Sequence, residues 1–350
     1  MKKREISYDL LRVIGIFVIM IGHANPPIWL QQLRSFGTPI LIITSALTHA
    51  YIYRERSIQI FPFYKKRMSR LIFPAWIFLT FFFLLYFVFS KILGGEYPFS
   101  FENILHSYTL YSGIGFLWIF KVYIILGLAT PMALYLNRRI RSGTSFYLLI
   151  LLLYLVYELA LYLSLGRIPV QLKEFSEQLI SFVPYVLLFF YGMRLDRLSD
   201  RQVLIIAVVS LILFGAIGFT LYQENHLVVY TKLYKYPPRL YFMAYTFFAI
   251  HLIYLFSRHY IHLFNSKRII LLSNHALWIY LWHILGYYIW GNVFSLIELP
   301  FESQFLNSFV KTVFMIGLSL SITALQVKLV RRYLLRSESK IVRNVAKYLQ

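Results

Sequence analysis

Residues 8–28 read YDLLRVIGIFVIMIGHANPPI, an apolar run long enough for a membrane helix that nevertheless contains Arg12 and His23. A transmembrane helix needs about 20 apolar residues to cross about 30 Å of hydrocarbon. On a helix, positions 12 and 23 differ by three turns plus about 20°, so both side chains lie on one face, about 16 Å apart along the axis. An ionisable residue at membrane depth is a candidate functional residue. Structural alternatives are an interfacial anchor for Arg12 and a packing role for His23.

The composition of the whole chain indicates an integral membrane protein. Of its 350 residues, 59% are hydrophobic and only 14% are charged, which is more apolar than a soluble domain of this size. Ten apolar stretches are long enough to span a bilayer, and each must be helical because lipid offers the backbone no hydrogen-bond partner. These stretches lie near residues 10–28, 37–53, 71–90, 114–136, 144–164, 179–194, 202–221, 240–256, 270–291 and 308–329. The predicted fold is therefore all-α, a polytopic transmembrane helix bundle of about ten spans.

The basic residues predict the orientation of this bundle. The chain has 35 Lys and Arg against 14 Asp and Glu, a net charge of +21, and most of the cations fall in alternate loops. This positive-inside pattern places both termini in the cytoplasm, and it accounts for the charge without a nucleic-acid partner. We expect one integral membrane domain over residues 1–330 whose first span is retained. Residues 331–350 form a basic cytoplasmic tail, either an amphipathic helix on the anionic leaflet or a solvated segment.

Arg67 and Arg70 form a candidate phosphate-binding pair where a basic loop meets the third predicted span. The two residues are three positions apart, so they share a face if this junction is helical. Two guanidinium groups on one face suit bidentate binding of phosphate. Ordinary positive-inside charge is the alternative explanation.

The ninth predicted span contains SNHALWIYLWHILGYY and carries two histidines, His275 and His283. They are about 80° apart around a helix, so they can face one pocket. Ser273 and Asn274 look like the cap that begins this helix. An interfacial position for His275 and a structural hydrogen bond for His283 are the alternatives.

Weaker candidates for an acceptor site or pocket are Trp118, Tyr123, Glu158 and His275. Trp118 and Tyr123 lie in a segment of small and aromatic residues, and Glu158 lies within the fifth span, where it could pair with a Lys or a His. The chain has no Cys, no P-loop, no GxSxG, no HExxH and no carboxylate pair suited to glycoside hydrolysis. Nucleotide hydrolysis, serine-hydrolase chemistry and zinc chemistry are disfavoured, and we expect no metal site.

The combination of these motifs resembles the acyltransferase-3 family of bacterial integral membrane proteins. It consists of Arg12 and His23 with ten residues between them, Arg67-x-x-Arg70 followed by LIFPAW, and the later SNHALWIYLWHI. The resemblance covers essentially the whole chain. It implies a multi-pass acyltransferase of the bacterial cytoplasmic (inner) membrane that acylates carbohydrates, often by O-acetylation of surface or exported polysaccharides. The second span has Ser45-Ala46 where the family often has Ser-Gly, and the chain resembles the standalone form, without a fused esterase-like domain.

The resemblance also implies roles for the candidate residues. A cytoplasmic acyl-CoA, most simply acetyl-CoA, would be a co-substrate rather than a permanently bound cofactor, with its phosphates at Arg12, Arg67 and Arg70. His23 would take the proton of the acceptor hydroxyl, or carry the acyl group as an acyl-imidazole. His283 would bind the acceptor, orient His23 or assist proton transfer. The rival functions are a transporter or flippase of a lipid-linked saccharide and a scaffold within a polysaccharide-synthesis complex.

Overall fold

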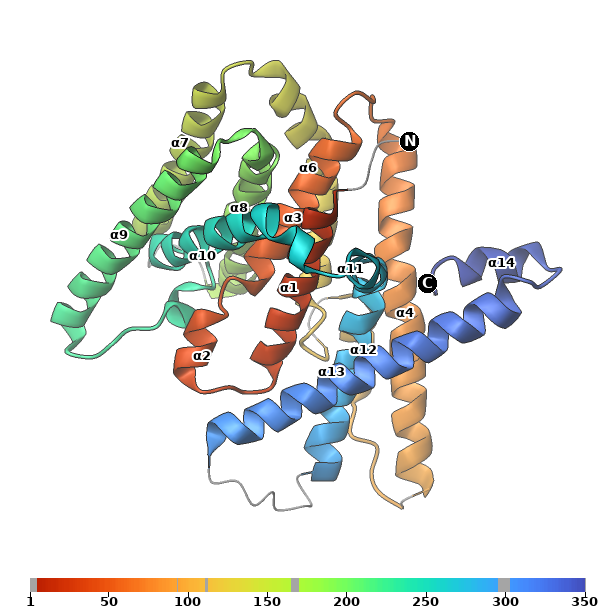
Figure 1. Ribbon diagram of the computed structural model, residues 1–350. Coiled ribbons are helices and arrows are strands. Elements are labelled where there is room, and N and C mark those ends of the chain that lie inside the picture. The colour runs from red at the N-terminus through yellow and green to blue at the C-terminus, as the bar shows by residue number, and fades with distance from the viewer. Residues whose placement is uncertain (1–4, 93, 111–112, 165–169, 295–302, 350) are drawn as a thin grey trace. The chain divides into compact units, whose positions relative to one another are not determined.

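The computed structural model describes residues 5–92, 94–110, 113–164, 170–294 and 303–349, and the regular elements within these ranges are helices (Figure 1). This confirms the all-α prediction. Among the described residues, eight helices are long and apolar enough to cross a membrane, or nine if α11 (Ser266–Asn274) and α12 (Ala276–Ile289), which meet at a bend, form one span. The predicted stretch near residues 179–194 falls on α8 (Val170–Gly192), whose side chains are not described over residues 170–179. The count of ten and the cytoplasmic termini therefore stay predictions.

The remaining long helices follow the predicted stretches. They are α1 (Ile6–His23), α3 (Gly37–Ile52), α4 (Ile60–Ile92), α6 (Trp118–Arg139), α7 (Gly143–Ser164), α9 (Asp200–Asn225), α10 (Leu240–His259) and α13 (Gln304–Leu329). The short helices are α2 (Ile28–Leu33), α5 (Phe101–Tyr108) and α14 (Lys340–Ala346). Helix α4 begins about ten residues before the apolar stretch that predicted it, because the basic residues of the preceding loop are good helix formers.

The chain folds as two compact units. The first comprises residues 1–22, 27–58 and 128–273, and the second comprises residues 23–26, 59–127 and 274–350. The chain passes between the units five times, within α1, α6 and α11 and after residues 26 and 58, so each unit is assembled from segments far apart in the sequence. The predicted tail, residues 331–350, belongs to the second unit.

In the first unit, small side chains let helices approach closely. Helix α3 packs against α8, and α9 packs against α10. A Cβ on Gly192 of α8 would lie 2.8 Å from the Cβ of Ala46 on α3, a distance that only glycine avoids. Ala46, the residue that departs from the family pattern, is thus still a small residue at a close helix contact.

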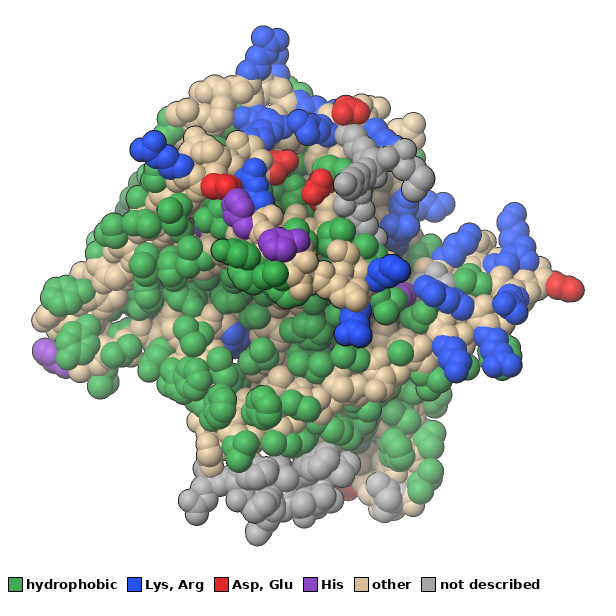
Figure 2. Space-filling view, in the orientation of Figure 1, with side chains coloured by type: hydrophobic (Ala, Val, Ile, Leu, Met, Phe, Trp, Pro, Cys, Tyr) green, Lys and Arg blue, Asp and Glu red, His purple; other side chains and the backbone are tan. Residues whose placement is uncertain are grey.

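The burial of the helices indicates which of them face lipid. In the span Ile28–Ile52, which joins α2 and α3, 72% of the most apolar 18-residue stretch is buried, whereas in α9 only 17% is. A helix that is apolar all round yet exposed on most of its surface needs a non-aqueous environment. Hydrophobic side chains accordingly cover much of the face seen in Figure 2.

In the second unit, α12 packs against α13 and α4, and the C-terminal segment folds back onto this core (Figure 1). The indole Nε1 of Trp278 donates to the carbonyl of Tyr348 at 3.0 Å. The side chain of Gln326 accepts from Trp282 Nε1 at 2.7 Å and donates to the carbonyl of Leu349 at 2.8 Å. The end of the tail is therefore held by the helices, while Lys and Arg gather over α14 (Figure 2).

Candidate functional site

Helix α1 carries Arg12 and His23, and His23 is its last residue. The helix ends there because Asn25 adopts a left-handed φ of 58° and is followed by two prolines, which cannot donate a backbone hydrogen bond. The helix is continuous from Ile6, so the prediction that Arg12 and His23 share a face is confirmed.

His23 and His283 form a stacked pair in the second unit. Their ring centroids are 5.3 Å apart, with 29° between the ring planes. Phe116 packs its edge against both rings, at 4.5 Å from His23 and 6.0 Å from His283. The hydroxyl of Tyr280 donates to the Phe116 carbonyl at 2.6 Å and so fixes the segment before α6. Two imidazoles from helices about 260 positions apart in the chain are thus brought together.

The surroundings of His283 determine which of its nitrogens can react. Its side chain is fully buried, and its Nδ1 is hydrogen-bonded to the carbonyl of Tyr280. A carbonyl can only accept, so Nδ1 carries the proton of the neutral ring. Nε2 then holds a lone pair, and it is buried without a hydrogen-bond partner among the residues that the structure describes. A buried acceptor left without a donor is costly unless a ligand or neighbour supplies one.

Arg12 is held by a polar cluster in the first unit. Its Nη1 donates to Ser273 Oγ at 2.9 Å and lies 3.6 Å from Asp9 Oδ1, while its Nη2 donates to Thr48 Oγ1 at 3.3 Å. Ser273 in turn donates to Asp9 at 2.6 Å. Arg12 is therefore a positioned cation with part of its charge balanced, rather than a freely snorkelling anchor. Its side chain keeps 30% of its surface exposed, so it can still meet an anion.

Arg67 and Arg70 lie on continuous helix in α4, so they share a face as predicted. The guanidinium of Arg67 lies 5.6 Å from the ring centroid of Tyr123 on α6. Gly127 lies beside this contact, since a Cβ there would be 3.1 Å from Cε of Met68 and 3.2 Å from Cγ of Arg67. Arg70 is exposed. Tyr123 is thus a neighbour of the arginine pair, and Trp118 is the first residue of α6.

The arginine pair and the histidine pair lie at different levels of the second unit. Phe78 on α4 contacts Trp282, the neighbour of His283, with ring centroids 5.5 Å apart. Phe78 is eight residues beyond Arg70, or about 12 Å along the helix, and eleven residues beyond Arg67, or about 16 Å. From the N-terminal end of α4, the arginine pair therefore comes before the level at which the histidine pair lies.

The other weak candidates do not join this cluster. Glu158 lies in the first unit, where Arg239 Nε donates to it at 2.8 Å and Tyr154 Oη donates to it at 2.8 Å, so its partner is an arginine rather than a Lys or His. His275 is buried just before α12, and neither ring nitrogen has a hydrogen-bond partner within the described part of the chain. Ser273 and Asn274 end α11 instead of beginning the next helix, so the predicted cap is wrong.

Some residues near the site were not predicted to belong to it. The ammonium of Lys311 on α13 lies 4.1 Å from the ring centroid of Tyr287, which packs at 4.8 Å from Phe116. Asp9 was also missed, although its position three residues before Arg12 is the spacing of a helical ion pair. Among the described residues no group of three or more His, Cys, Asp or Glu is arranged to hold a metal ion.

A comparison with known protein families bears on this geometry. The model of the acyltransferase-3 family, described as an acyltransferase domain, matches residues 5–325. The chain belongs to the acyltransferase-3 family. The match spans α1, α4 and α12, and so includes every residue of the arginine and histidine pairs. This acyltransferase matches no curated protein and no solved structure.

Proposed function

We propose that this acyltransferase moves an acyl group, most simply acetyl, from cytoplasmic acyl-CoA to a hydroxyl of a cell-surface or exported carbohydrate. The observation that carries the proposal is the stacked pair of His23 and His283, in which His283 Nε2 is buried with its lone pair unused. An acyl transfer to a hydroxyl needs a base at the reacting atoms. In this family member, the imidazole pair is the best-placed base.

The reaction follows from the chemistry of a neutral imidazole. His23, which is half-buried, takes the proton of the acceptor hydroxyl as that oxygen attacks the thioester carbonyl carbon. The new C–O bond forms, the C–S bond breaks, and the thiolate of CoA leaves and receives the proton from the imidazolium. In the covalent variant, a histidine nitrogen first takes the acyl group and then passes it to the hydroxyl. His283 acts beside His23 as a positioning residue or as the second proton carrier.

The donor is recognised by its phosphates. Arg67 and Arg70 present two guanidinium groups on one face of α4, the geometry that charge-assisted, bidentate phosphate contacts require. Arg12 is proposed as a further phosphate ligand from α1. The spacing of about 12–16 Å along α4 between the arginine pair and the level of the histidines suits a long, thin pantetheine arm that carries the thioester away from its phosphates.

The alternative function, a transporter or flippase of a lipid-linked saccharide, would also use the arginines on pyrophosphate. A transporter gives no role to the buried His283 imidazole with its unused lone pair. This imidazole therefore favours group transfer over transport.

Purified protein with radiolabelled acetyl-CoA and a candidate glycan tests the proposal. We expect label in the glycan from the wild-type protein and a rate about 10²–10⁴-fold lower from His23→Ala, the range for loss of a general base. His262→Ala, at an exposed histidine outside the pair, is the matched control and retains the rate. Transfer by His23→Ala at the wild-type rate contradicts the assignment, and movement of saccharide without consumption of acetyl-CoA supports the transporter.

The arginine pair is tested by donor binding. Replacing Arg67 and Arg70 by Ala raises the Kd for acetyl-CoA and leaves acceptor binding unchanged. Arg141→Ala, at an exposed arginine of another loop, has no effect. An unchanged Kd in the double variant shows that the pair serves only the orientation of the chain.

A further inference from the structure

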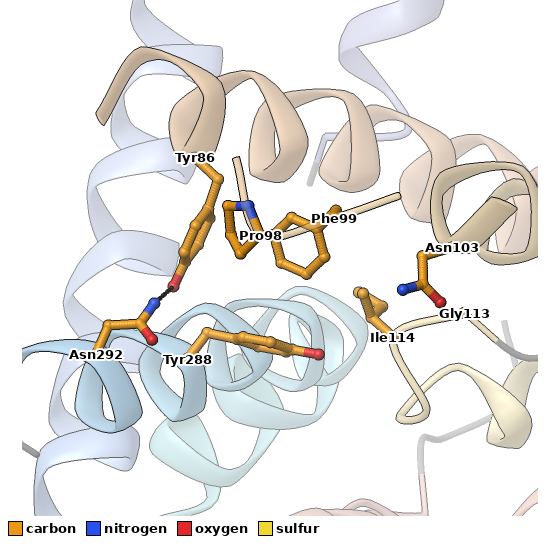
Figure 3. Close-up of a pocket in the computed structure, with 8 residues that line it drawn as sticks. All are labelled: Tyr86, Pro98, Phe99, Asn103, Gly113, Ile114, Tyr288 and Asn292. Atoms are coloured by element: carbon orange, nitrogen blue, oxygen red, sulfur yellow. Dashed lines mark hydrogen bonds between the residues drawn. The ribbon is translucent and has the colours of Figure 1, made fainter. Parts of the chain in front are cut away.

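A cavity of about 290 Å³ lies in the second unit, where the end of α4, the segment before α5, and the end of α12 meet (Figure 3). The residues that line it include Tyr86, Phe99, Asn103, Gly113, Tyr288 and Asn292. None of them was singled out by the sequence patterns, and none of the described residues that line the cavity carries a charge.

Three aromatic rings form the apolar part of this cavity. Tyr86, Phe99 and Tyr288 pack edge to face, with ring centroids 5.3 Å apart for Tyr86 and Phe99, 5.8 Å for Phe99 and Tyr288, and 6.1 Å for Tyr86 and Tyr288. Mutual packing holds each ring in one orientation. Rigid aromatic faces are surfaces on which the C–H side of a pyranose ring can stack, because the ring face carries partial negative charge.

Amide and hydroxyl groups supply the polar part. Asn292 Nδ2 donates to Tyr86 Oη at 3.1 Å (Figure 3), and this bond does not use the hydrogen of the phenol. Asn103, from α5, is exposed and faces the cavity from the opposite side to Asn292. Each amide both donates and accepts, as a sugar hydroxyl does. The described part of the lining contains no cation, which argues against a phosphate-bearing ligand such as CoA.

Ser107 of α5 holds Gly113 and Ile114 beside Asn103. Gly113 has a φ of 60°, and a Cβ there would be 2.1 Å from Oγ of Ser107. The same hydroxyl donates to the Asn103 carbonyl at 2.7 Å and accepts from the backbone N–H of Ile114 at 3.1 Å. The wall is therefore preorganised, which lowers the entropy cost of binding.

The cavity and the histidine pair share an aromatic wall. The ring of Tyr288 lies 6.3 Å from that of Phe116, which in turn lies 4.5 Å from His23. A ligand on the Tyr288 face is thus one side chain away from the proposed base.

We propose that this cavity, the Tyr86–Phe99–Tyr288 pocket, binds an uncharged pyranose ring of the acceptor and presents one hydroxyl toward His23. The assignment rests on the proposed acyl transfer for its biological role, but sugar binding itself needs no catalysis. It names the acceptor class as a neutral sugar unit held by stacking and amide hydrogen bonds, in contrast to an acidic sugar or a phosphate group.

Saturation-transfer NMR on the full chain in lipid nanodiscs, which avoid sugar-based detergents, tests this pocket. The probes are the methyl α-pyranosides of glucose, galactose and mannose, with sodium glucuronate as the charged comparison. We expect at least one neutral glycoside to bind, and to bind equally to the His23→Ala variant. Glucuronate binds more weakly, because nothing in the lining pairs with its carboxylate.

Substitutions of the lining residues test whether glycoside binding depends on this pocket. Phe99→Ala and Asn103→Ala each raise the Kd of the bound glycoside about tenfold, since a lost stacking or hydrogen-bonding contact is worth about 1 kcal/mol or more. Phe101→Ala and Leu105→Ala are the controls, because these side chains are 80% and 50% exposed on the same short helix and do not line the cavity. An unchanged unfolding midpoint in all four variants shows that they fold.

Failure of this inference can be distinguished from failure of the proposed function. If no neutral glycoside binds the wild-type protein, or if binding persists in both Phe99→Ala and Asn103→Ala, the pocket assignment is wrong even when acetyl transfer occurs. If glycoside binding depends on the pocket but no acetyl is transferred, the pocket stands as a sugar site and the proposed reaction fails.

Discussion

Removing the charge of Arg12 will cost stability, because Asp9 is buried beside it, and we also expect it to weaken the proposed binding of the donor phosphates. The Asp9 side chain is 6% exposed, its Oδ1 lies 3.6 Å from Arg12 Nη1, and it accepts a hydrogen bond from Ser273 at 2.6 Å. In Arg12→Gln the carboxylate keeps Ser273 but loses its counter-charge. Loss of donor affinity in a single Arg12 variant therefore has two possible causes, which a double variant separates.

The expected losses in the free energy of unfolding follow from the exposed fractions of the Arg12 and Asp9 side chains. Breaking a buried ion pair from one side costs about 3–5 kcal/mol, and we expect about 3 kcal/mol for Arg12→Gln because Arg12 is 30% exposed and Ser273 remains. Asp9→Asn leaves a partly solvated cation and costs about 1–2 kcal/mol. The double variant has no uncompensated charge, so it is less destabilised than Arg12→Gln alone.

Unfolding by SDS in mixed micelles gives the free energies, and titration calorimetry gives the Kd for acetyl-CoA. The double variant Asp9→Asn, Arg12→Gln recovers about 1–2 kcal/mol of stability relative to Arg12→Gln. Its affinity for acetyl-CoA stays about 10–100-fold below that of the wild type, because the phosphate still lacks its cation.

Two results would refute this reasoning. Equal destabilisation of the single Arg12 variant and the double variant would show that Asp9 does not depend on Arg12. Recovery of donor affinity together with stability would show that Arg12 acts only through the fold and binds no phosphate.

Further predictions concern groups outside these sites. Burial, followed by the charge of Arg34, lowers the pKa of Lys235 from 10.5 to about 7. Between about pH 7 and pH 10.5 the unfolded chain therefore holds a proton on Lys235 that the folded chain has lost, so the free energy of unfolding rises with pH over this range. We expect Lys235→Gln to abolish this rise, as measured by unfolding midpoints at each pH. Gly113→Ala forces a left-handed alanine against Ser107 and costs about 3 kcal/mol, whereas Gly115→Ala, at a φ of 63° but in open space, costs about 1 kcal/mol in the same unfolding assay.

Local periodicity was sufficient to predict the features that depend on a single helix. Helical geometry predicts that Arg12 shares a helix face with His23, and that Arg67 shares one with Arg70. The apolar stretches predict the positions of the spans. The same reasoning failed at Ser273, which looked like a helix cap but forms hydrogen bonds to a residue 264 positions away. Capping preferences describe neighbours along the chain, and the Arg12–Asp9–Ser273 cluster depends on tertiary packing that they do not contain.

The site itself could not be predicted from local spacing, because it depends on contacts between residues far apart in the sequence. The eight-residue spacing of His275 and His283 predicts a common pocket, but only His283 contacts His23, because His275 precedes α12 and lies about two turns away along the axis. Phe116 lies in an irregular segment before α6, and the cavity beside Tyr288 forms where α4, α5, α12 and irregular segments meet, which the period of a single helix does not predict. Lys311 lies within the apolar stretch 308–329, but its spacing in the sequence does not indicate its neighbour Tyr287.

The hydrogen bonds from Trp278 and Gln326 to the carbonyls of Tyr348 and Leu349 bear on how this protein is made. The unit that these carbonyls complete also includes residues 23–26. The helices around His283 therefore acquire all their native contacts only after Tyr348 and Leu349 have been synthesised. Until that point, the early spans remain in the bilayer as a partly assembled intermediate.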